Sequence, residues 1–578
     1  MEGTFILSDY KEDIKEITNQ IGISENQVIS FPSFDNESGW HNWTTQLFKD
    51  NDIKKLVVPI SIPTDSPINS QGLMIALHIR LNYELSIEKR LIPIIFLSDF
   101  SLDVILRKNN FDVDNNSQNL LFTKGVFLSS FDKDEILNTI TKSGPCYSED
   151  YRKLVLNKLR VLQKASTGKH SIANAWGCLK LALVTGLRNE IFKLDAVSDM
   201  LKTLYAKYLI CYNEVYSEEK RIDLQPLKCL GKKILFIDDQ ADEGWSELMT
   251  NIFKSAGNNF VSVDSSKYKN KETKQFHDFD GFYNESRSHI CKDWDLIIID
   301  LRLNPEKEDI DNEMITPTDF SGYKLIDEFL NENSGYQIIV STASNKIWNI
   351  NAALDRGASS YYVKESPEFN YTINDTNKHY ENFKTDVQKC FDKCYLRDIY
   401  KETKQLIQKL NVNSSTSFIN EIINQLMLAY SLLKSANSKE QFAYAYVSLY
   451  LVIEIINNDC IIKGSNDKWE INGNGCLLDW KWDANSNSYT NSGAEVIGNK
   501  PPEWQKFAGL YYQKWNLSDH NFIKQLYFLI IKRNGFVHND KSILDKEDNS
   551  GNYLNHDVFK PDGYIKLFRH IKKIISYL

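Results

Sequence analysis

The chain alternates between stretches with strand-like and helix-like spacing of hydrophobic residues. Within residues 1–135, five short apolar runs of the kind that forms buried strands are separated by amphipathic segments of helical length. The runs are Thr4–Leu7, Gln27–Ser30, Lys55–Ile60, Ile92–Leu97 and Gly125–Leu128. This alternation predicts a small, doubly wound α/β domain at the start of the chain.

A second region of the same alternation begins at Lys232 and ends near residue 368. The segments on either side of it have apolar residues at three- and four-residue spacing, which predicts helices. An insertion at 464–502, rich in Gly, Asn and Trp, is compatible with either a hairpin or a loop. We therefore expect a multidomain protein of α/β plus all-α class. Its predicted parts are an α/β domain at 1–147, a helical connector at 148–225, a doubly wound α/β domain at 226–375, a linker helix at 376–412 and a helical bundle at 413–578.

Composition narrows the class of protein. The chain has 42% hydrophobic and 25% charged residues, and its formal net charge is −9. That charge disfavours a surface that coats nucleic acid, although it is compatible with a small local site that acts on RNA. The nine cysteines include no CxxC pair, which is typical of a reducing cytosol. The first residues lack a basic segment followed by an apolar run, and no stretch reaches membrane-spanning length, so we expect a cytoplasmic protein without a membrane partner.

Polar residues follow the predicted strands of the second α/β domain. Ligand sites in open α/β sheets lie beyond the carboxyl ends of the strands, so the side chains at these ends are expected to converge. One acid at a strand end is usually solvated or caps a helix, but several strand ends that carry complementary groups in sequence favour a site. The groups are, in chain order, Asp238 and Asp239, Asp300, Ser341 and Thr342, and Lys364.

These residue types suit a phosphoryl-transfer site that contains magnesium. Clustered carboxylates repel one another unless a hard cation neutralises them, and Mg²⁺ prefers oxygen ligands. We expect Asp238, Asp239 and Asp300 to bind Mg²⁺, which attracts a phosphoryl donor. Thr342 and Lys364 would hold phosphoryl oxygens while charge is redistributed during transfer.

With these residues, segment 232–368 resembles a bacterial response-regulator receiver domain. The resemblance implies that Asp238 and Asp239 are the acid pair and Asp300 the phosphoacceptor. It also implies that Thr342 is the switch hydroxyl and that Tyr361 is the switch aromatic. A histidine kinase or another phosphodonor or sensor protein would then be a partner in a two-component phosphorelay. Two features depart from the family pattern, namely a long loop after Asp300 and Glu365 in place of the proline that commonly follows the lysine.

The first α/β domain resembles a degenerate receiver. Its first strand ends at Ser8 and Asp9, and its third strand ends near Pro59, with no acid at the acceptor position. The resemblance implies a pseudo-receiver used for contacts with other molecules.

Near the C-terminus, the helical segment FIKQLYFLIIKRNGFVHND carries Arg533 and His538. An offset of five residues separates two side chains by about 140° on a regular helix, so alignment requires Gly535 to loosen or end the helix. An arginine can stabilise a pentavalent phosphate, and a histidine can remove or return a proton. An acid in an earlier apolar helix, Glu454, is in a position to pack against this segment. Alternatively, the arginine and the histidine are ordinary residues at a helix end.

RNGFVH resembles the R-x4-H motif of HEPN domains, which are four-helix bundles and include metal-independent endoribonucleases. The resemblance implies that Arg533 and His538 are catalytic and that Asn534 supports them. It also implies a homodimer through the HEPN domain. The substrate would be RNA, such as tRNA or mRNA, because the reaction uses the 2′-hydroxyl of the substrate, and cleavage would need no cofactor.

Together these features predict a signal-controlled endoribonuclease of a bacterium, of the type that serves as a toxin or an anti-phage defence effector. Occupancy of the acidic pocket would shift the receiver between two arrangements, and the linker helix would carry the change to the HEPN domain. A second hypothesis is a non-enzymatic response regulator or scaffold whose helical bundle binds a protein or a nucleotide. A DNA-binding regulator is disfavoured because no helix-turn-helix pattern follows the receiver.

Overall fold

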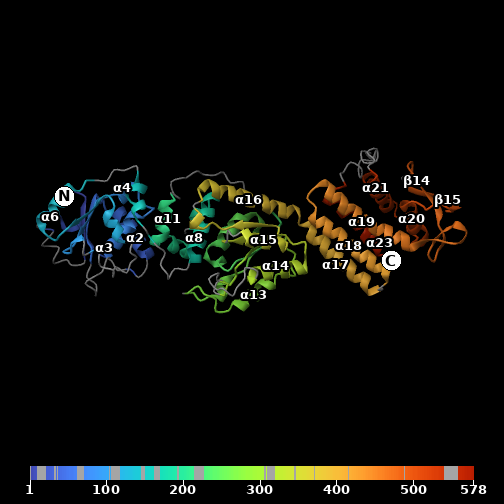
Figure 1. The fold of residues 1–578 in the computed structure, drawn as a ribbon, viewed down its shortest axis with the longest axis horizontal. Helices are drawn as coiled ribbons and strands as arrows, with labels where there is room; N and C mark the ends of the chain where they lie inside the picture. The colour runs from blue at the N-terminus through green and yellow to red at the C-terminus, as the bar shows by residue number, and fades with distance from the viewer. Residues whose placement is uncertain are drawn as a thin grey trace. The chain divides into compact units, whose positions relative to one another are not determined.

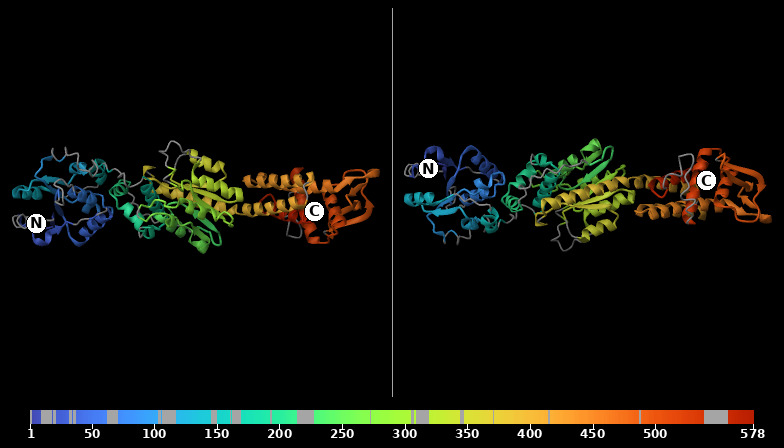
Figure 2. Two further views of the ribbon diagram at one scale, coloured as in Figure 1. Left: turned by 90° about the horizontal axis from the view of Figure 1, so that it is seen from below. Right: turned by 90° about the horizontal axis from the view of Figure 1, so that it is seen from above.

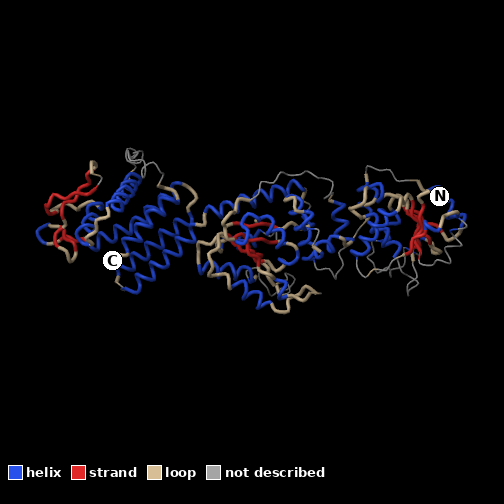
Figure 3. The backbone as a smooth tube through the Cα atoms, turned by 180° about the vertical axis from the view of Figure 1, so that it is seen from behind, coloured by secondary structure: helices blue, strands red, loops and turns tan. Residues whose placement is uncertain are grey.

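The chain divides into two compact units, which are described separately below. The first comprises Met1–Asp327 with Ile338–Phe391, and the second comprises Glu328–Gln337 with Asp392–Leu578. In Figure 3 strands lie inside the helices in the first unit, whereas helices predominate in the second. The computed structural model describes all residues except 1, 9–17, 19–20, 32–33, 35–36, 62–70, 103–104, 106–116, 145–149, 160, 162–168, 192–193, 214–226, 272, 305–306, 309–318, 344–346, 370, 414–415, 487 and 539–557.

The N-terminal α/β domain is built on a parallel five-stranded sheet in the order β2-β1-β3-β4-β5. The predicted doubly wound domain is therefore confirmed, with strand ends that lie within two residues of the expected positions. The strands are β1 (Thr4–Ser8), β2 (Val28–Ser30), β3 (Lys55–Pro59), β4 (Ile94–Leu97) and β5 (Val126–Ser129). The helices are η1 (Glu25–Gln27), α2 (Glu37–Asp50), α3 (Gln71–Arg80), α4 (Ile87–Arg90), η2 (Ser117–Phe122) and α6 (Lys133–Lys142); Figure 1 shows this domain in blue and cyan.

The segment predicted as a helical connector consists, in its described residues, of helices joined by short turns. Its elements are α7 (Tyr151–Leu154), η3 (Leu156–Lys158), α8 (Lys169–Val184), α9 (Arg188–Ile191), α10 (Asp195–Leu201) and α11 (Leu204–Tyr212). Helix α8 packs against α12 (Trp245–Ile252) of the second α/β domain, so the connector and that domain share a buried interface.

The second α/β domain repeats the strand order of the first. Its parallel sheet runs β7-β6-β8-β9-β10, so both sheets place the first strand between the second and the third, the flavodoxin-like order. The central strands are fully buried because helices cover both faces of a parallel sheet, which is why they are continuous apolar runs in sequence. The strands are β6 (Ile234–Ile237), β7 (Phe260–Ser262), β8 (Leu296–Asp300), β9 (Ile338–Thr342) and β10 (Ser360–Val363). Besides α12, the helices are η4 (Ala241–Glu243), η5 (Lys254–Asn259), η6 (Ser265–Tyr268), α13 (Phe279–Arg287), α14 (Ser321–Glu332), α15 (Ile347–Asp355), η8 (Pro367–Phe369) and α16 (Ile373–Asp392).

The second unit is a helical bundle with a small β-region. Helix α19 packs against α18 and α23, and these are the orange and red helices in Figures 1 and 2. The bundle core contains Leu426, Leu449, Leu526 and Leu567. Its helices are α17 (Tyr395–Asn413), α18 (Ser417–Ser435), α19 (Lys439–Cys460), α20 (Glu503–Gly509), the π-turn η10 (Leu510–Lys514), α21 (His520–Val537) and α23 (Pro561–Ile575).

The insertion at 464–502, for which the sequence left hairpin and loop open, forms antiparallel strands. One sheet has the order β11-β12-β13 and the other is the hairpin β14-β15. Trp482 in β14 stacks on Tyr527 of α21, with ring centroids 3.9 Å apart. The insertion is therefore anchored to the bundle by aromatic packing. Strand β11 (Ile461–Lys463) directly precedes the insertion, whose own elements are η9 (Ser465–Asp467), β12 (Trp469–Ile471), β13 (Gly475–Cys476), β14 (Leu478–Asp483) and β15 (Ser488–Glu495).

Across the residues that the structure describes, no helix is both long enough and apolar enough to cross a membrane.

A buried arginine fixes the loops of the N-terminal domain. Arg80, at the end of α3, is fully buried, and its guanidinium donates hydrogen bonds to the carbonyl oxygens of Arg90, Ile92 and Gly125. The hydroxyl of Tyr151 in α7 donates to the carbonyl oxygen of Arg80 itself. One side chain thus satisfies carbonyl groups that precede β4 and β5, next to the start of the connector.

We predict that Arg80→Met destabilises this domain by about 3 kcal/mol, because three carbonyl groups lose a donor. Amide hydrogen exchange in β4 and β5 should accelerate by roughly 100-fold, as each factor of ten corresponds to about 1.4 kcal/mol. Lys153→Met, at an exposed position of the connector, is the control and should leave exchange unchanged. Unchanged exchange in Arg80→Met would show that water replaces the guanidinium without cost.

Candidate functional site

The structure brings the predicted acidic residues to one end of the second sheet. Asp238 and Asp239 follow β6, Asp300 is the last residue of β8, and Lys364 follows β10. All strands of this sheet are parallel, so their carboxyl ends lie at the same edge. Carboxylate oxygens of the three aspartates lie within 4.8 Å of one another. The ammonium Nζ of Lys364 donates to Asp238 Oδ2 at 2.6 Å and to Asp300 Oδ2 at 2.9 Å.

Burial and like charge make this arrangement unfavourable for the aspartates alone. Burial raises the pKa of Asp238 to about 6, and burial together with the two neighbouring carboxylates raises the pKa of Asp239 well above its usual value. Burial would lower the pKa of Lys364, but the carboxylates of Asp238 and Asp300 reverse this effect and raise it. Three carboxylates and one ammonium leave two negative charges. A divalent cation fits this donor set, since it would neutralise them with oxygen ligands of the kind that Mg²⁺ prefers.

A second lysine, which the sequence analysis did not single out, lies beside the acidic residues. Lys269 is buried, and its Nζ donates to Asp242 Oδ1 at 3.0 Å; Ser265 Oγ donates to the same oxygen at 2.8 Å. Burial opposes its charge, but the carboxylates of Asp239, Asp242 and Glu243 together raise the pKa of Lys269. No motif marks this lysine, because it comes from the loop after β7 and reaches the site only through folding.

The remaining receiver-type residues have different exposures. Thr342, the last residue of β9, is buried, and Ala343 after it lines the pocket. Tyr361 on β10 has 41% of its surface exposed. A Cβ at Gly322 would lie 2.2 Å from the carbonyl oxygen of Asp300, so the first turn of α14 approaches the end of β8 as closely as only glycine allows.

The long loop after Asp300 is described only in part, since residues 305–306 and 309–318 lie outside the described chain. Glu308 is buried and accepts a hydrogen bond from the backbone N–H of Ser321, the first residue of α14, at 2.8 Å. Burial raises the pKa of this carboxyl group. Glu308 therefore attaches the loop to the start of α14 near Asp300.

The acidic residues line a small pocket whose wall includes a residue of the connector. The cavity measures about 30 Å³, which is space for one or two water-sized groups. Asn174 of α8 forms part of the wall together with Asp239, Gln240, Asp300, Arg302, Ala343 and Lys364. No sequence signal connects position 174 with the strand ends, because the two are brought together by packing alone.

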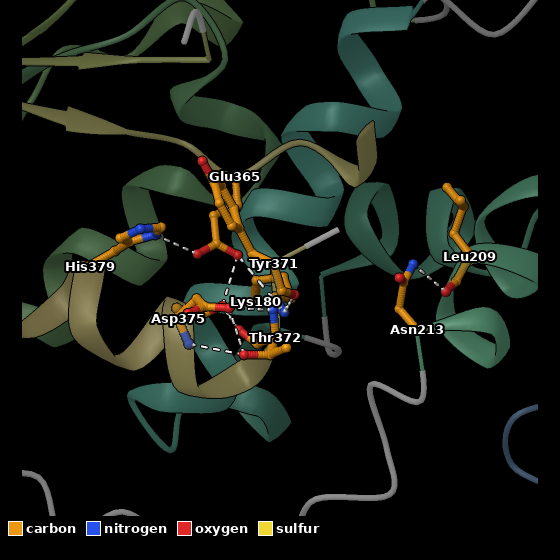
Figure 4. A network of polar contacts seen from close by, with 9 residues as sticks. Lys180, Leu209, Asn213, Glu365, Tyr371, Thr372, Asp375 and His379 are labelled. Carbon is orange, nitrogen blue, oxygen red and sulfur yellow. Dashed lines mark hydrogen bonds and ion pairs between the residues drawn. The ribbon is translucent and has the colours of Figure 1, made fainter. Parts of the chain in front are cut away.

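Glu365 takes part in a buried polar network between α8 and the strand end. Its carboxylate lies 3.9 Å from Lys180 Nζ, and both side chains are only 3% exposed. It also accepts a hydrogen bond from Thr376 Oγ1 at 2.8 Å and lies 3.0 Å from His379 Nδ1. In Figure 4 the side chains of Lys180 and His379 both point toward Glu365. The residue that replaces the usual proline thus connects α8 with α16.

The Arg–His motif of the second unit lies at the end of α21, but Gly535 does not loosen this helix. The helix continues to Val537, so that expectation was wrong: Gly535 is buried in the bundle, where packing outweighs the low helix propensity of glycine. His538 is the C-cap residue and is exposed. In the described part of the chain, no hydrogen bond joins Arg533 and His538.

Arg533 is held by residues of its own helix and of α19. Its Nη2 donates to Glu454 Oε1 at 2.6 Å, and its Nη1 donates to Asn534 Oδ1 at 3.0 Å. Its guanidinium carbon lies 4.7 Å from the ring centroid of Tyr450. The expected packing of Glu454 against the motif is therefore observed. The arginine is preorganised by these contacts, while the histidine is open to solvent.

Two described strand ends of the N-terminal domain differ in chemistry from those of the second. Its third strand ends in Pro59, the position that Asp300 occupies in the other sheet, and Ser130 follows its last strand where Lys364 follows β10. Asp9, noted after the first strand, lies outside the described residues. Residues 9–129 match the family model of the inactive receiver domain. This match confirms that the N-terminal domain is a degenerate receiver. No curated protein matches the chain.

We predict that Asp239→Asn stabilises the first unit near neutral pH in the absence of divalent cations. The folded-state pKa of Asp239 is raised, so its carboxylate destabilises the folded state at pH values above the unfolded pKa, and the amide removes this cost. The unfolding temperature should rise by about 2–4 °C for each kcal/mol gained. Magnesium should raise the unfolding temperature of the wild type but have little effect on the variant.

The measurement is thermal unfolding monitored by circular dichroism, with EDTA or with magnesium chloride. Asp355→Asn, at the exposed end of α15, is the matched control and should behave as the wild type in both buffers. A variant that unfolds at a lower temperature than the wild type in EDTA would indicate that Asp239 is stabilised by its surroundings, contrary to this account of the pocket.

Proposed function

We propose that the second α/β domain is a receiver that accepts a phosphoryl group on Asp300 in the presence of Mg²⁺. In this proposal it controls a HEPN-type endoribonuclease in the C-terminal helical unit. The observation that carries the proposal is the convergence of Asp238, Asp239, Asp300 and Lys364 at one strand edge. The inactive receiver at 9–129 supports it as well, because the second domain has the same strand order and ends its third strand in Asp300, where the first domain has Pro59.

The chemistry of the pocket follows from these positions. A bound Mg²⁺ would be held by Asp238, Asp239 and Asp300 and would screen the charge of an incoming phosphoryl donor. An oxygen of Asp300 attacks phosphorus and forms the new O–P bond, and the bond to the donor breaks with its electron pair leaving on the donor. Lys364, whose ammonium contacts Asp300, would bind an oxygen of the transferred phosphoryl group. A histidine kinase or a small phosphodonor would supply the group.

In the helical unit, Arg533 would stabilise the negative charge of the phosphate during attack by the 2′-hydroxyl of RNA, such as tRNA or mRNA, and His538 would transfer the proton. Asn534 and Glu454 orient the arginine through their hydrogen bonds. The reaction would need no metal cofactor. Such a protein would be cytoplasmic and would act as a signal-controlled toxin or antiviral defence effector.

We propose further that two copies meet through the helical unit, so that two motifs form one active site. Beside the motif, Val537 is 46% exposed and Tyr444 is 60% exposed, and the Tyr444 ring contacts the Phe536 ring. On α18, Met427 and Leu428 are also exposed. Apolar side chains near a polar site are typical of surfaces that become buried on association.

One observation favours a second candidate function, that of a non-enzymatic response regulator or scaffold. Arg533 already forms an ion pair with Glu454, and among the described residues no hydrogen bond joins it to His538. An arginine neutralised by a partner at 2.6 Å is also what a structural helix pair requires. In that case the helical unit binds a protein or a nucleotide without cleaving RNA.

For the receiver, acetyl phosphate and magnesium are expected to add the mass of one phosphoryl group to the wild type and none to Asp300→Asn. Lys364→Ala should reduce the rate of uptake by roughly tenfold or more, because it removes the only ammonium group that contacts Asp300 among the described residues. Intact-protein mass spectrometry measures the change, with Asp355→Asn as the control. Uptake that persists in Asp300→Asn would place the acceptor elsewhere.

For the helical unit, the purified protein should cleave tRNA in the presence of EDTA. The assay compares protein with and without prior phosphorylation. Arg533→Ala and His538→Ala should each lower the rate by roughly 100-fold, as expected for loss of charge stabilisation or of proton transfer. The matched controls are Arg569→Ala and His520→Ala, which change exposed residues on α23 and at the start of α21. If the wild type cleaves no RNA in either state, the scaffold is the better description.

A further inference from the structure

Helix α8 of the connector completes the acidic pocket of the second α/β domain. Asn174 is only 3% exposed and forms part of the pocket wall beside Asp300 and Lys364. In a buried asparagine, both the oxygen and the nitrogen of the side-chain amide are normally hydrogen-bonded. Within the described chain, however, Asn174 makes one such bond, which it accepts from the indole Nε1 of Trp245.

The bond from Trp245 fixes which end of the amide faces the pocket. An indole nitrogen is only a donor, so it must meet the oxygen Oδ1 of Asn174 and not its nitrogen. Trp245 is fully buried, and its ring also lies 4.8 Å from Lys364 Nζ, so the indole is itself held in place. The amide nitrogen Nδ2, with two N–H groups, is therefore the end of Asn174 left for a ligand in the pocket.

The position of α8 is fixed by close packing and by charge. A Cβ at Gly177 would lie 3.1 Å from the Trp245 ring and 3.2 Å from the carbonyl oxygen of Glu365, so the helix approaches the strand end more closely than most residues allow. Three residues further along, Lys180 forms the buried ion pair with Glu365 and donates to the carbonyl oxygen of Tyr371 at 2.8 Å. Asn174 and Gly177 lie on one face of the helix, at a spacing of three residues.

We propose that Asn174 is a phosphoryl-binding residue that the connector supplies to the receiver pocket. Its Nδ2 donates a hydrogen bond to an oxygen of a phosphoryl group on Asp300. An amide N–H group can donate a hydrogen bond to an anionic oxygen but cannot coordinate a cation. Asn174 therefore binds the phosphoryl group and not the metal. Phosphorylation thereby strengthens the docking of α8, and the connector becomes the element that senses the state of Asp300. This inference rests on the proposed acceptance of a phosphoryl group by Asp300.

The test uses the full-length protein and beryllofluoride, which mimics a phosphoryl group on aspartate, with magnesium present. Asn174→Ala should weaken beryllofluoride binding by roughly tenfold or more, as expected for loss of a hydrogen bond to a charged group, and should leave the affinity for magnesium alone unchanged. Trp245→Phe keeps the ring but removes the N–H that orients the amide, and it should weaken beryllofluoride binding in the same direction. Asn213→Ala is the matched control, because the side chain of this connector asparagine, which is absent from the pocket wall, donates to the Leu209 carbonyl oxygen at 2.9 Å (Figure 4).

The possible outcomes separate this inference from the function on which it depends. Wild-type affinity for beryllofluoride in Asn174→Ala would overturn the inference and leave phosphoryl acceptance standing. Tighter or faster binding in Asn174→Ala would also overturn it, since α8 would then be an obstacle to the ligand. A wild-type protein that binds neither beryllofluoride nor a phosphoryl group would overturn both. Loss of magnesium binding in Asn174→Ala would show that the variant disrupts the pocket in general, and this too contradicts a role confined to the phosphoryl group.

Discussion

The contact of one ammonium group with two buried carboxylates is the interaction on which the second α/β domain depends. Lys364 lies between Asp238 and Asp300, at the ends of three different strands. Buried charges are tolerated only when they are paired, and removing one partner leaves the others uncompensated. Even with this lysine the pocket keeps an excess of negative charge. A divalent cation at this edge of the sheet, as proposed above, would neutralise that excess.

The two α/β domains have the same fold but different residues at the strand ends that would form a site. Both have the same strand order, and both sheets are formed by buried apolar runs. In the first domain, however, Pro59 ends the third strand and Ser130 follows the last, where the second domain has Asp300 and Lys364. The sheet needs only the apolar pattern, whereas the site needs particular residues at strand ends. A domain that matches the inactive receiver family can thus have this architecture without Asp300 and Lys364 at the corresponding strand ends.

Around the pocket, charge pairs connect segments that are distant in sequence. Lys180 of α8 pairs with Glu365, and Glu365 also contacts Thr376 and His379 of α16. The second unit uses the same principle, since Glu454 of α19 pairs with Arg533 of α21. A buried ion pair is favourable only when its two groups lie close together and remain charged. A change of charge at one group therefore changes how strongly the element that carries the other group is held. Through Glu365, α8 and α16 are therefore both connected to the end of β10, next to Lys364.

The amino-acid sequence by itself determined the local elements of this protein and the chemistry of its strand ends. Central strands of a parallel sheet are continuous apolar runs, so the five strands of the first domain and strands β6, β8, β9 and β10 of the second were predicted from the sequence, whereas the short edge strand β7 was not. The residues after each strand of a parallel sheet must share an edge. Only the tertiary structure decided what packs over that edge. Asn174, Lys269 and Glu308 come from a distant helix and from loops, and no periodicity encodes their approach. Packing likewise kept Gly535 helical and folded the insertion at 464–502 into strands, because burial against neighbouring elements outweighs the local preference of a residue.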